Sequence, residues 1–313
     1  MAYTNFVVSG LTAYIEQSKD VLIKNVVFGR GTRERISIQT GVKFKEHLHI
    51  FDVDPVFADG SDCGFTGAGT ATISERLIEA PAIKVQMEIC PQNLLGKYAE
   101  YLVRLNATEH ELPFEQYLMD GIVDGINRKI ETMIWLGDKT NASSDPVKKW
   151  IDGFITIAGS ATGVVPVSIA SGSTAYEGVL AVYNALTENA LERGAEIYVS
   201  PAIFRAFMQD MVAKNFFHYN PGNENLEYFL LPGTDVKVVK TLGLAGSLKI
   251  LGSYPANLYY GCDMQNDNED VDMWWSQDNR TFRLEVLWNS GVQIAFPDQV
   301  ALGTFAAAPA PTA

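Results

Sequence analysis

The sequence predicts an α+β protein, in which β segments, one long helix and a mixed helix–strand region follow one another along the chain. Three observations carry this prediction. Residues 70–88 alternate apolar and polar side chains with the period of two that half-buried strands show. Residues 112–137 repeat a large apolar residue at every fourth position, which indicates a helix. Beyond residue 153, shorter helical and strand patterns alternate up to residue 304.

The composition is that of a globular protein with a large core, because 47% of the 313 residues are hydrophobic and 19% are charged. The formal net charge of −13 argues against tight nucleic-acid binding by the ordered body, since a sequence-independent binder needs a basic face. Residues 1–5 lack the basic start of a signal peptide, and no apolar run reaches the ~18 residues of a membrane helix. We therefore expect a protein made and kept in a cytoplasm, with no membrane partner.

The three cysteines, Cys63, Cys90 and Cys262, are odd in number, widely spaced and form no Cys-x-x-Cys pair. Free thiols in a reducing compartment explain this pattern best. Neither a disulfide nor a zinc site is therefore predicted.

The region after residue 45 predicts extended β structure. Residues 46–53 indicate a strand, and a glycine-rich loop follows over residues 60–69. Two further β segments come next, one on either side of Ala80-Pro81. We predict that these two segments pair with each other as a long hairpin, which the glycines allow to swing.

The apolar face of this hairpin predicts a contact with another chain. An isolated two-stranded hairpin is marginally stable in water, and no neighbouring helical sequence covers this one. The candidate inter-subunit contact residues are Ile73, Arg76, Leu77, Ile83, Val85 and Met87. Val85→Asp is accordingly expected to leave the fold intact and to abolish assembly.

Residues 112–137 form the clearest helical segment. Their apolar positions make one long slanting stripe, and Pro113 suits a first helical turn. About 26 residues at 1.5 Å each give a helix nearly 40 Å long, which suits a structural spine.

The flanking regions are less regular. Residues 4–25 indicate a short helix or arm, and residues 306–313 form a low-complexity tail that we expect to be mobile. Residues 174–192 indicate a helix capped by Ser173 or Thr174. The further predicted elements are a strand at 196–200, a helix from Pro201 to Lys214, and short strands at 235–240, 247–252, 256–261, 281–287, 291–296 and 299–304.

No constellation in the sequence meets the requirements of a catalytic or metal site. His47 and His49 fall on one face of a predicted strand, as two metal ligands do, but no third ligand is near them. The glycine-rich loop lacks the Lys-Ser/Thr ending of a phosphate loop and precedes a strand. The acidic run from Asp263 to Asp272 fails the spacing of a calcium loop and indicates a solvated loop. We therefore predict no catalytic, cofactor-binding or metal-binding residues.

The order of the elements resembles that of the major capsid proteins of tailed bacteriophages, which have the Hong Kong 97-like capsid fold. The likeness covers residues 40–304 and lies in the order of elements, since no single motif is diagnostic. The segments that carry it are residues 62–70 with 73–87 (the extended loop), 114–136 (the spine helix), 152–158 (entry into the axial domain), 197–205 (its central strand and next helix), and 282–286, 291–295 and 297–300 (strands returning to the peripheral domain).

The resemblance implies a layout and a function. The implied parts are an N-terminal arm (1–45), an extended β-hairpin loop (46–90), a peripheral domain with the spine helix (91–150 and 281–305), an α/β axial domain (151–280) and a mobile tail (306–313). The implied function is that of a structural virion protein without enzymatic activity. It would self-assemble into the pentamers and hexamers of an icosahedral shell that encloses the phage dsDNA genome without binding it specifically.

The resemblance also implies partners, namely other copies of the chain and portal and decoration proteins. Some relatives begin with a long scaffolding region that is cleaved off, but here the β structure starts near residue 46, which implies a separate scaffold protein or none. Some relatives link their subunits by an isopeptide bond from a loop lysine. Between Asp52 and Ile83 this chain has Arg76 but no lysine, so we predict a shell without covalent links.

Two alternatives remain open from the sequence. An encapsulin, a bacterial nanocompartment that encloses a cargo enzyme, has the same fold. The low-complexity tail and the lack of an evident cargo-docking groove favour the phage form. A metal-dependent hydrolase would use His47, His49 and the acidic run, and stoichiometric bound metal would be required to support it.

Overall fold

The structure, a computed structural model, describes residues 15–16, 18–19, 21–29, 31–57, 69–90, 114–140, 145–215, 227–263 and 270–309. Its helices are α3 (Phe114–Leu136), α4 (Phe154–Ser160), α5 (Ala175–Ala185), α6 (Glu188–Glu192) and α7 (Pro201–Ala213). Its strands are β1 (Ser37–Thr40), β2 (Phe44–Asp54), β3 (Thr70–Ala80), β4 (Ala82–Ile89), β5 (Val165–Ile169), β6 (Glu196–Val199), β7 (Tyr228–Leu230), β8 (Lys237–Lys240), β9 (Lys249–Ser253), β10 (Leu258–Cys262), β11 (Asp270–Ser276), β12 (Thr281–Ile294) and β13 (Ala301–Phe305).

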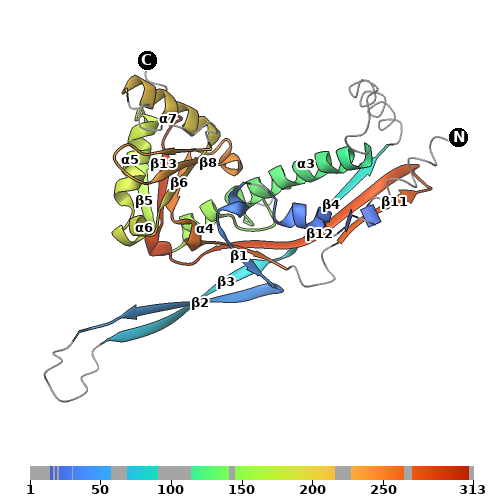
Figure 1. Cartoon of the computed structure of the whole chain (residues 1–313), viewed down its shortest axis with the longest axis horizontal. Coiled ribbons are helices and arrows are strands. Elements are labelled where there is room, and N and C mark those ends of the chain that lie inside the picture. The colour runs from blue at the N-terminus through green and yellow to red at the C-terminus, as the bar shows by residue number, and fades with distance from the viewer. Residues whose placement is uncertain are drawn as a thin grey trace.

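The 14-residue strand β12 organises a five-stranded sheet. The first part of β12 lies between β11 and β4, and its last part pairs with β10, beyond which β1 lies. Helix α3 runs along this sheet (Figure 1). Residues of β12 are buried alternately up to Trp288, because successive side chains in a strand point to opposite faces and one face meets the core.

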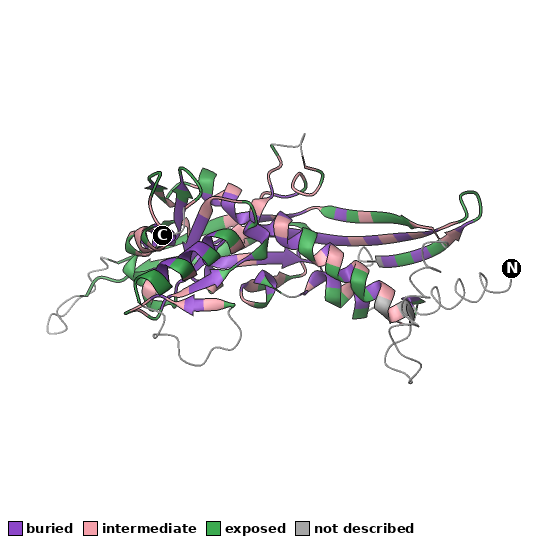
Figure 2. Cartoon of the chain, turned by 90° about the horizontal axis from the view of Figure 1, so that it is seen from above, coloured by how far each residue is buried: buried purple, intermediate pink, exposed green. Residues whose placement is uncertain are grey.

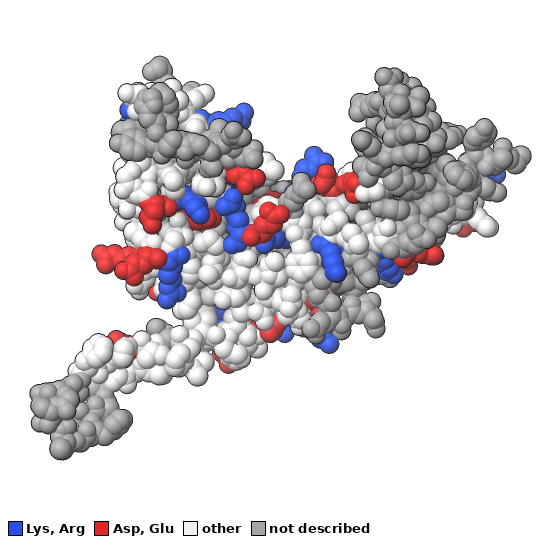
Figure 3. Space-filling view, viewed as in Figure 1, with Lys and Arg blue, Asp and Glu red and all other residues white. Residues whose placement is uncertain are grey.

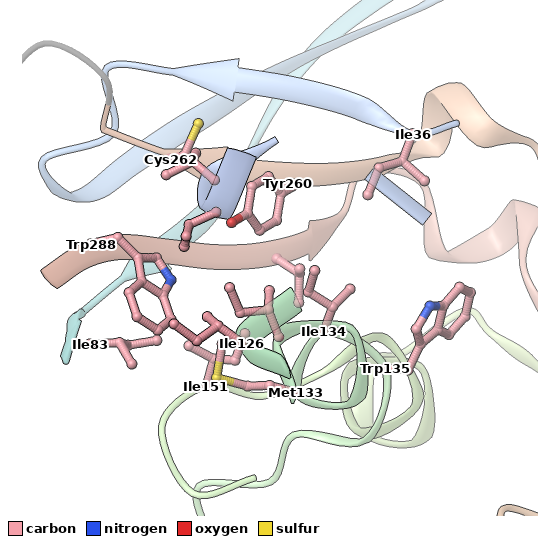
Figure 4. Packing of buried hydrophobic residues seen from close by; sticks show 14 of the residues in the cluster. Ile36, Ile83, Ile126, Met133, Ile134, Trp135, Ile151, Tyr260, Cys262 and Trp288 are labelled. Atoms are coloured by element: carbon pink, nitrogen blue, oxygen red, sulfur yellow. The ribbon is translucent and has the colours of Figure 1, made fainter. Parts of the chain in front are cut away.

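An apolar core fills the space between α3 and the five-stranded sheet. Figure 4 shows Ile126, Met133 and Ile134 of α3 close to Tyr260 of β10 and Trp288 of β12. The large apolar residues at every fourth position of α3 supply the side chains that the helix contributes to this core. The predicted spine helix is therefore confirmed, and the two residues expected before Phe114 lie outside the described part of the chain.

A second sheet has six strands in the order β5-β13-β9-β6-β8-β7 and a separate apolar core that includes residues of α5 and α7. Figure 2 shows buried residues concentrated where helices cover the sheets. Thr174 starts α5 with a capping box, in which its hydroxyl accepts from the Glu177 N–H and the Glu177 carboxylate accepts from the Thr174 N–H. Gly178 of α5 lies against the ring of Phe305, where a β-carbon would be 2.3 Å from Cζ.

The helix predicted over residues 174–192 is two helices, α5 and α6. Leu186 between them is extended, with φ −70° and ψ 143°, and only 8% exposed. Its side chain packs over Gly252 of β9. The predicted helix is therefore interrupted where the Leu186 side chain is buried on the sheet. Thr187 is the N-cap of the next helix, α6.

The closing strands also differ from the prediction. Residues 281–287 and 291–296 were expected to be separate strands, but they belong mainly to the single strand β12, because β4 and β10 pair with it end to end. The end of the predicted acidic loop forms β11, on the edge of the same sheet. Strand β13 joins the six-stranded sheet. Strand β11 thus belongs to the five-stranded sheet and β13 to the six-stranded sheet, while the domain bounds implied by the resemblance remain a prediction.

The predicted hairpin pairs differently from the expectation. Strand β3 pairs antiparallel with β2 along all 11 residues of each strand, and β4 pairs with β12 in the five-stranded sheet. We call the β2–β3 pair the ribbon. Strand β2 ends at Asp54 and β3 begins at Thr70, both at the end of the ribbon away from the body, and residues 58–68 of the predicted glycine-rich loop lie outside the described part. The expectation that these glycines form a hinge at the base of the hairpin is therefore wrong.

Candidate inter-subunit surface

The ribbon extends away from both sheets (Figure 1). With 11 residues in each strand and about 3.4 Å per residue, it is about 37 Å long. Figure 3 shows few charged side chains on its visible side. The first six residues of β3, from Thr70, are all exposed, so this part of the ribbon has little contact with its own subunit.

One side of the ribbon carries a contiguous apolar patch. Phe51 and Ile73 lie directly opposite each other and are 64% and 69% exposed. Val53, which is 47% exposed, lies opposite Ala71 in the next cross-strand pair on that side. A contiguous exposed patch of large apolar side chains marks an interaction site.

Beside this patch, one carboxylate is held between two imidazoles. Glu75 Oε1 lies 3.3 Å from His49 Nδ1, and Glu75 Oε2 lies 3.2 Å from His47 Nδ1. The three side chains share the side of Phe51 and Ile73, because Glu75 lies opposite His49 and residues two apart on a strand point the same way. Each of the three side chains is more than half exposed.

The base of the ribbon packs tightly on the five-stranded sheet. Ile78 is fully buried there. A β-carbon at Gly291 of β12 would lie 2.0 Å from the carbonyl oxygen of Glu79, and one at Gly261 of β10 would lie 2.8 Å from Cγ2 of Ile78. Glycine at both positions therefore allows the close approach of β3. This packing fixes the direction in which the ribbon leaves the body.

Polar contacts add to this anchoring. Gln293 Nε2 donates to the Leu77 carbonyl oxygen at 2.6 Å. The Glu79 carboxylate pairs with Lys139, which follows α3, and with Lys45 of β2, each at 2.7 Å. Hydrogen bonds and attraction from these two ammonium groups, Lys139 first, lower the pKa of Glu79 to about 2. The Lys139 pair ties the ribbon to the end of the spine helix.

Lys139→Met is expected to weaken this anchoring only where Glu79 is ionised. Because the pKa of Glu79 is lowered, the stabilisation is complete above its ordinary value of 4.5 and is lost as the pH falls toward about 2. Exposure of the pair limits the loss at pH 7 to less than about 1 kcal/mol. Urea unfolding at pH 7 and pH 3 checks this, with the variant expected to lose less stability on acidification than the unsubstituted protein. An equal loss in both proteins would contradict the assignment.

The six predicted contact residues fall into two groups. The ribbon carries Ile73, Arg76 and Leu77, and β4 carries Ile83, Val85 and Met87. Of the first group, Ile73 is exposed, and the other two are half-buried nearer the base.

The placement of the β4 residues on the hairpin is wrong. Ile83 is 4% exposed and Val85 is partly buried, and both belong to the core under α3, while Met87 is 38% exposed. Val85→Asp would place a carboxylate against that core, so this substitution is now expected to lower the stability of the fold. Phe51 and Val53 were missed, although their alternation with polar residues after His49 was visible in the sequence.

The residues considered for metal chemistry are dispersed. His47 and His49 contact Glu75 on the ribbon, Asp263 is fully buried, and residues 264–269 lie outside the described part. Within the described ranges, no group of three or more His, Cys, Asp or Glu side chains is placed to hold a metal ion.

The remaining sequence predictions have mixed outcomes. Among the described residues, Cys90 and Cys262 form no disulfide. Cys63, His110 and His218 lie outside the described residues, as do the last four residues of the tail. In the part of the chain that the structure describes, no helix is long and apolar enough to cross a membrane.

The chain is similar over most of its length to subunits of solved viral and compartment shells. Similar structures include the satellite phage P4 procapsid (TM-score 0.60, 13% identity, 91% of this chain and 98% of that chain). The capsid of the empty GTA particle is also similar (TM-score 0.58, 15% identity, 89% and 91%). So is the SrpI encapsulin of Synechococcus elongatus (TM-score 0.52, 12% identity, 87% and 85%).

These likenesses establish the fold. The chain has the Hong Kong 97-like capsid fold, as the order of its elements predicted. No protein-family model matches the sequence, and no curated protein matches it.

Proposed function

We propose that the chain is the major capsid protein of a tailed bacteriophage and forms the pentamers and hexamers of an icosahedral shell. The observation that carries the proposal is the ribbon, which projects the exposed Phe51 and Ile73 beyond the subunit's own cores. The fold, shared with phage capsids, supports the same role. The function is structural and not enzymatic, the place of the mature protein is the virion, and assembly takes place in the bacterial cytoplasm.

Assembly of the shell rests on burial of apolar surface between copies of the chain. The ribbon of one copy lies on a neighbour and covers Phe51, Val53 and Ile73, with Leu77 at the margin of the contact. Arg76 points to the other side of the ribbon. Obligate interfaces often bury more than about 2,000 Å² and are relatively apolar. Because the base of the ribbon is fixed, its direction is set before assembly, and less conformational entropy is lost on docking.

The charge of the chain fits a container for DNA. With a net charge of −13, the subunit has no overall attraction for phosphates, so the shell encloses dsDNA without specific binding. Separate scaffold, portal and decoration proteins complete the particle in this proposal. Sedimentation of the purified protein tests self-assembly, with rings of five or six subunits or complete shells as the expected species.

An encapsulin-type compartment is the second candidate, favoured by the similarity to the SrpI encapsulin. Particles purified from the cells that naturally produce them separate the two. The phage form requires nuclease-protected double-stranded DNA inside the particle. The compartment form requires a co-purifying protein cargo and no genome-length DNA.

The shell is expected to be held together without covalent links between subunits. Lys84, next along the chain after the lysine-free stretch, lies on β4 of the five-stranded sheet and not on the ribbon. Lys45 lies on the ribbon, but at its base, where it pairs with Glu79. Particles boiled in detergent with reductant should therefore migrate as a single band at 34.4 kDa. A ladder of linked oligomers would overturn the expectation.

A further inference from the structure

The chain crosses between the two sheets at two places that lie side by side and have the same form. Strand β9 of the six-stranded sheet continues through the turn Pro255–Asn257 into β10 of the five-stranded sheet. Strand β12 returns through the turn Pro297–Gln299 to β13. Each turn is a three-residue 3₁₀ helix that begins with proline after an aromatic residue, Tyr254 in the first and Phe296 in the second. Because proline fixes φ, neither crossing is suited to the φ/ψ changes by which connecting segments act as hinges.

The side chain of Asn257 joins the two crossings. It is fully buried, its Oδ1 accepts from the Phe296 N–H at 2.6 Å, and its Nδ2 donates to the Phe296 carbonyl oxygen at 2.9 Å. Nδ2 also donates to Ser253 Oγ at 3.2 Å, and the Asn257 backbone carbonyl accepts from the Ala295 N–H at 3.0 Å. An amide serves both backbone groups of Phe296 because it contains a donor and an acceptor, whereas an ionised carboxylate of the same shape only accepts.

Arg193 contacts the same two crossings from the outside. It follows α6 and is exposed. The centre of its guanidinium lies 5.3 Å from the ring centroid of Tyr254 and 5.8 Å from that of Phe296, and Nη1 donates to the Tyr254 hydroxyl at 2.9 Å. One planar cation therefore holds the aromatic residue of each crossing by cation–π attraction. We call the two aromatic–proline turns with Asn257 and Arg193 the junction.

The junction resists any change in the angle between the two sheets. Rotation of one sheet against the other would separate the crossings and leave the buried Asn257 amide and the Phe296 backbone unpaired, which is costly. The third connection, from α3 to α4, is also closed at its ends. The Gly137 carbonyl oxygen accepts from the Gly153 N–H at 2.9 Å and from Thr156 Oγ1 at 2.6 Å. The angle is therefore defined within the free subunit.

We propose that the junction sets the curvature of the shell by fixing the angle between the five-stranded and six-stranded sheets, with Asn257 and Arg193 as positioning residues. The inference rests on the proposed function. A subunit of a closed shell contacts neighbours on all its sides, so both sheets carry contacts, and the ribbon is fixed to the five-stranded sheet at its base. The angle between the sheets therefore determines the angle at which neighbouring subunits meet. Small differences in this angle accumulate around the particle.

The test measures shell diameters by electron microscopy for the unsubstituted chain and for two junction variants. The unsubstituted chain is expected to give shells of one diameter. Asn257→Ala removes the hydrogen bonds of the amide to Phe296 and Ser253, and its shells are expected to lose this uniformity. Arg193→Gln should widen the distribution of diameters in the same way but less, because the buried amide remains in place.

Thr174→Ala is the control for lost stability. It removes the hydrogen bond that caps α5, which lies within the six-stranded unit and away from the junction. Thermal unfolding of every protein measures the loss of stability, and the control is expected to keep the diameter of the unsubstituted shells.

The outcomes that overturn the proposal are distinct. Folded junction variants whose shells keep the original diameter contradict this inference alone, as do shells of several diameters from the unsubstituted chain. Equal widening by Thr174→Ala also contradicts it, because the effect would then follow stability and not the junction. If Asn257→Ala does not fold, the exposed Arg193→Gln substitution decides by the same measurement. Absence of shells from the unsubstituted chain contradicts the proposed function itself.

Discussion

Replacing Ile73 with aspartate is expected to give a folded subunit that no longer builds shells. Ile73 is 69% exposed in the subunit, so the substitution should change the free energy of unfolding by less than about 0.5 kcal/mol. In the assembled shell, the new carboxylate would be buried beside Phe51 without a partner, which costs several kcal/mol at each contact. Circular dichroism should therefore report a normal fold, and size-exclusion chromatography should report no particles.

Ser74→Asp provides the matched control for this experiment. Ser74 is exposed and adjacent in sequence, but it points to the other side of the ribbon, where it lies opposite Ile50. The control has the same added charge on the same strand and is expected to assemble. Shells from Ile73→Asp in normal yield would show that the apolar patch is not the contact surface.

Substitution of Gly291 by alanine is expected to displace the base of the ribbon. The added β-carbon would meet the backbone oxygen of Glu79 at 2.0 Å, and a backbone atom cannot move aside as the end of a side chain can. Overpacking of this kind costs about 1–3 kcal/mol of stability. Because the ribbon would leave the body in a changed direction, shell yield should fall further than the loss of stability explains. Thermal unfolding and particle yield, measured on the same preparation, separate the two effects.

Gly121→Ala is the control for this substitution. Gly121 is exposed on α3, and a β-carbon there meets nothing within 4 Å. In a helix interior, this exchange should stabilise the protein by about 0.5–1 kcal/mol and leave assembly unchanged. Equal behaviour of the two alanine variants would contradict the role of Gly291 in seating the ribbon.

The sequence predicted the long elements well, because their periodicity is strong. The spine helix begins and ends close to the expected residues, since its apolar repeat corresponds to a real buried stripe. Strand β6 and helix α7 also lie where the strand signal and Pro201 placed them, and the Ser200 hydroxyl accepts from the Ile203 N–H at the cap. In these elements the local signal and the tertiary packing agree.

Strand pairing could not be predicted in the same way. Both β3 and β4 alternate apolar and polar residues, and alternation shows that one face is buried without showing which strand lies alongside. The partner of β4, strand β12, is about 200 residues away in the chain, a separation visible in the 199-residue interval between Gln86 and Glu285. The direct connection through Ala80-Pro81 suggested a hairpin, whereas the chain passes there from the ribbon into a different sheet. Three of the six candidate contact residues were therefore placed on the wrong element.

The side-chain contacts within the ribbon and at its base could not be predicted from the sequence either. Glu75 is separated from His47 and His49 by more than 25 residues, and only the register of β2 and β3 brings them together. The sequence alone does not show why residue 291 is glycine, because the reason is the close approach of β3 to β12 at that position.

Electron microscopy of the purified protein tests the central claim, that this chain builds shells, most directly. Closed icosahedral particles, or rings of five and six subunits, are expected, with each ribbon lying on the neighbouring subunit. A monodisperse monomer of 34.4 kDa that forms neither rings nor shells at high concentration would contradict it.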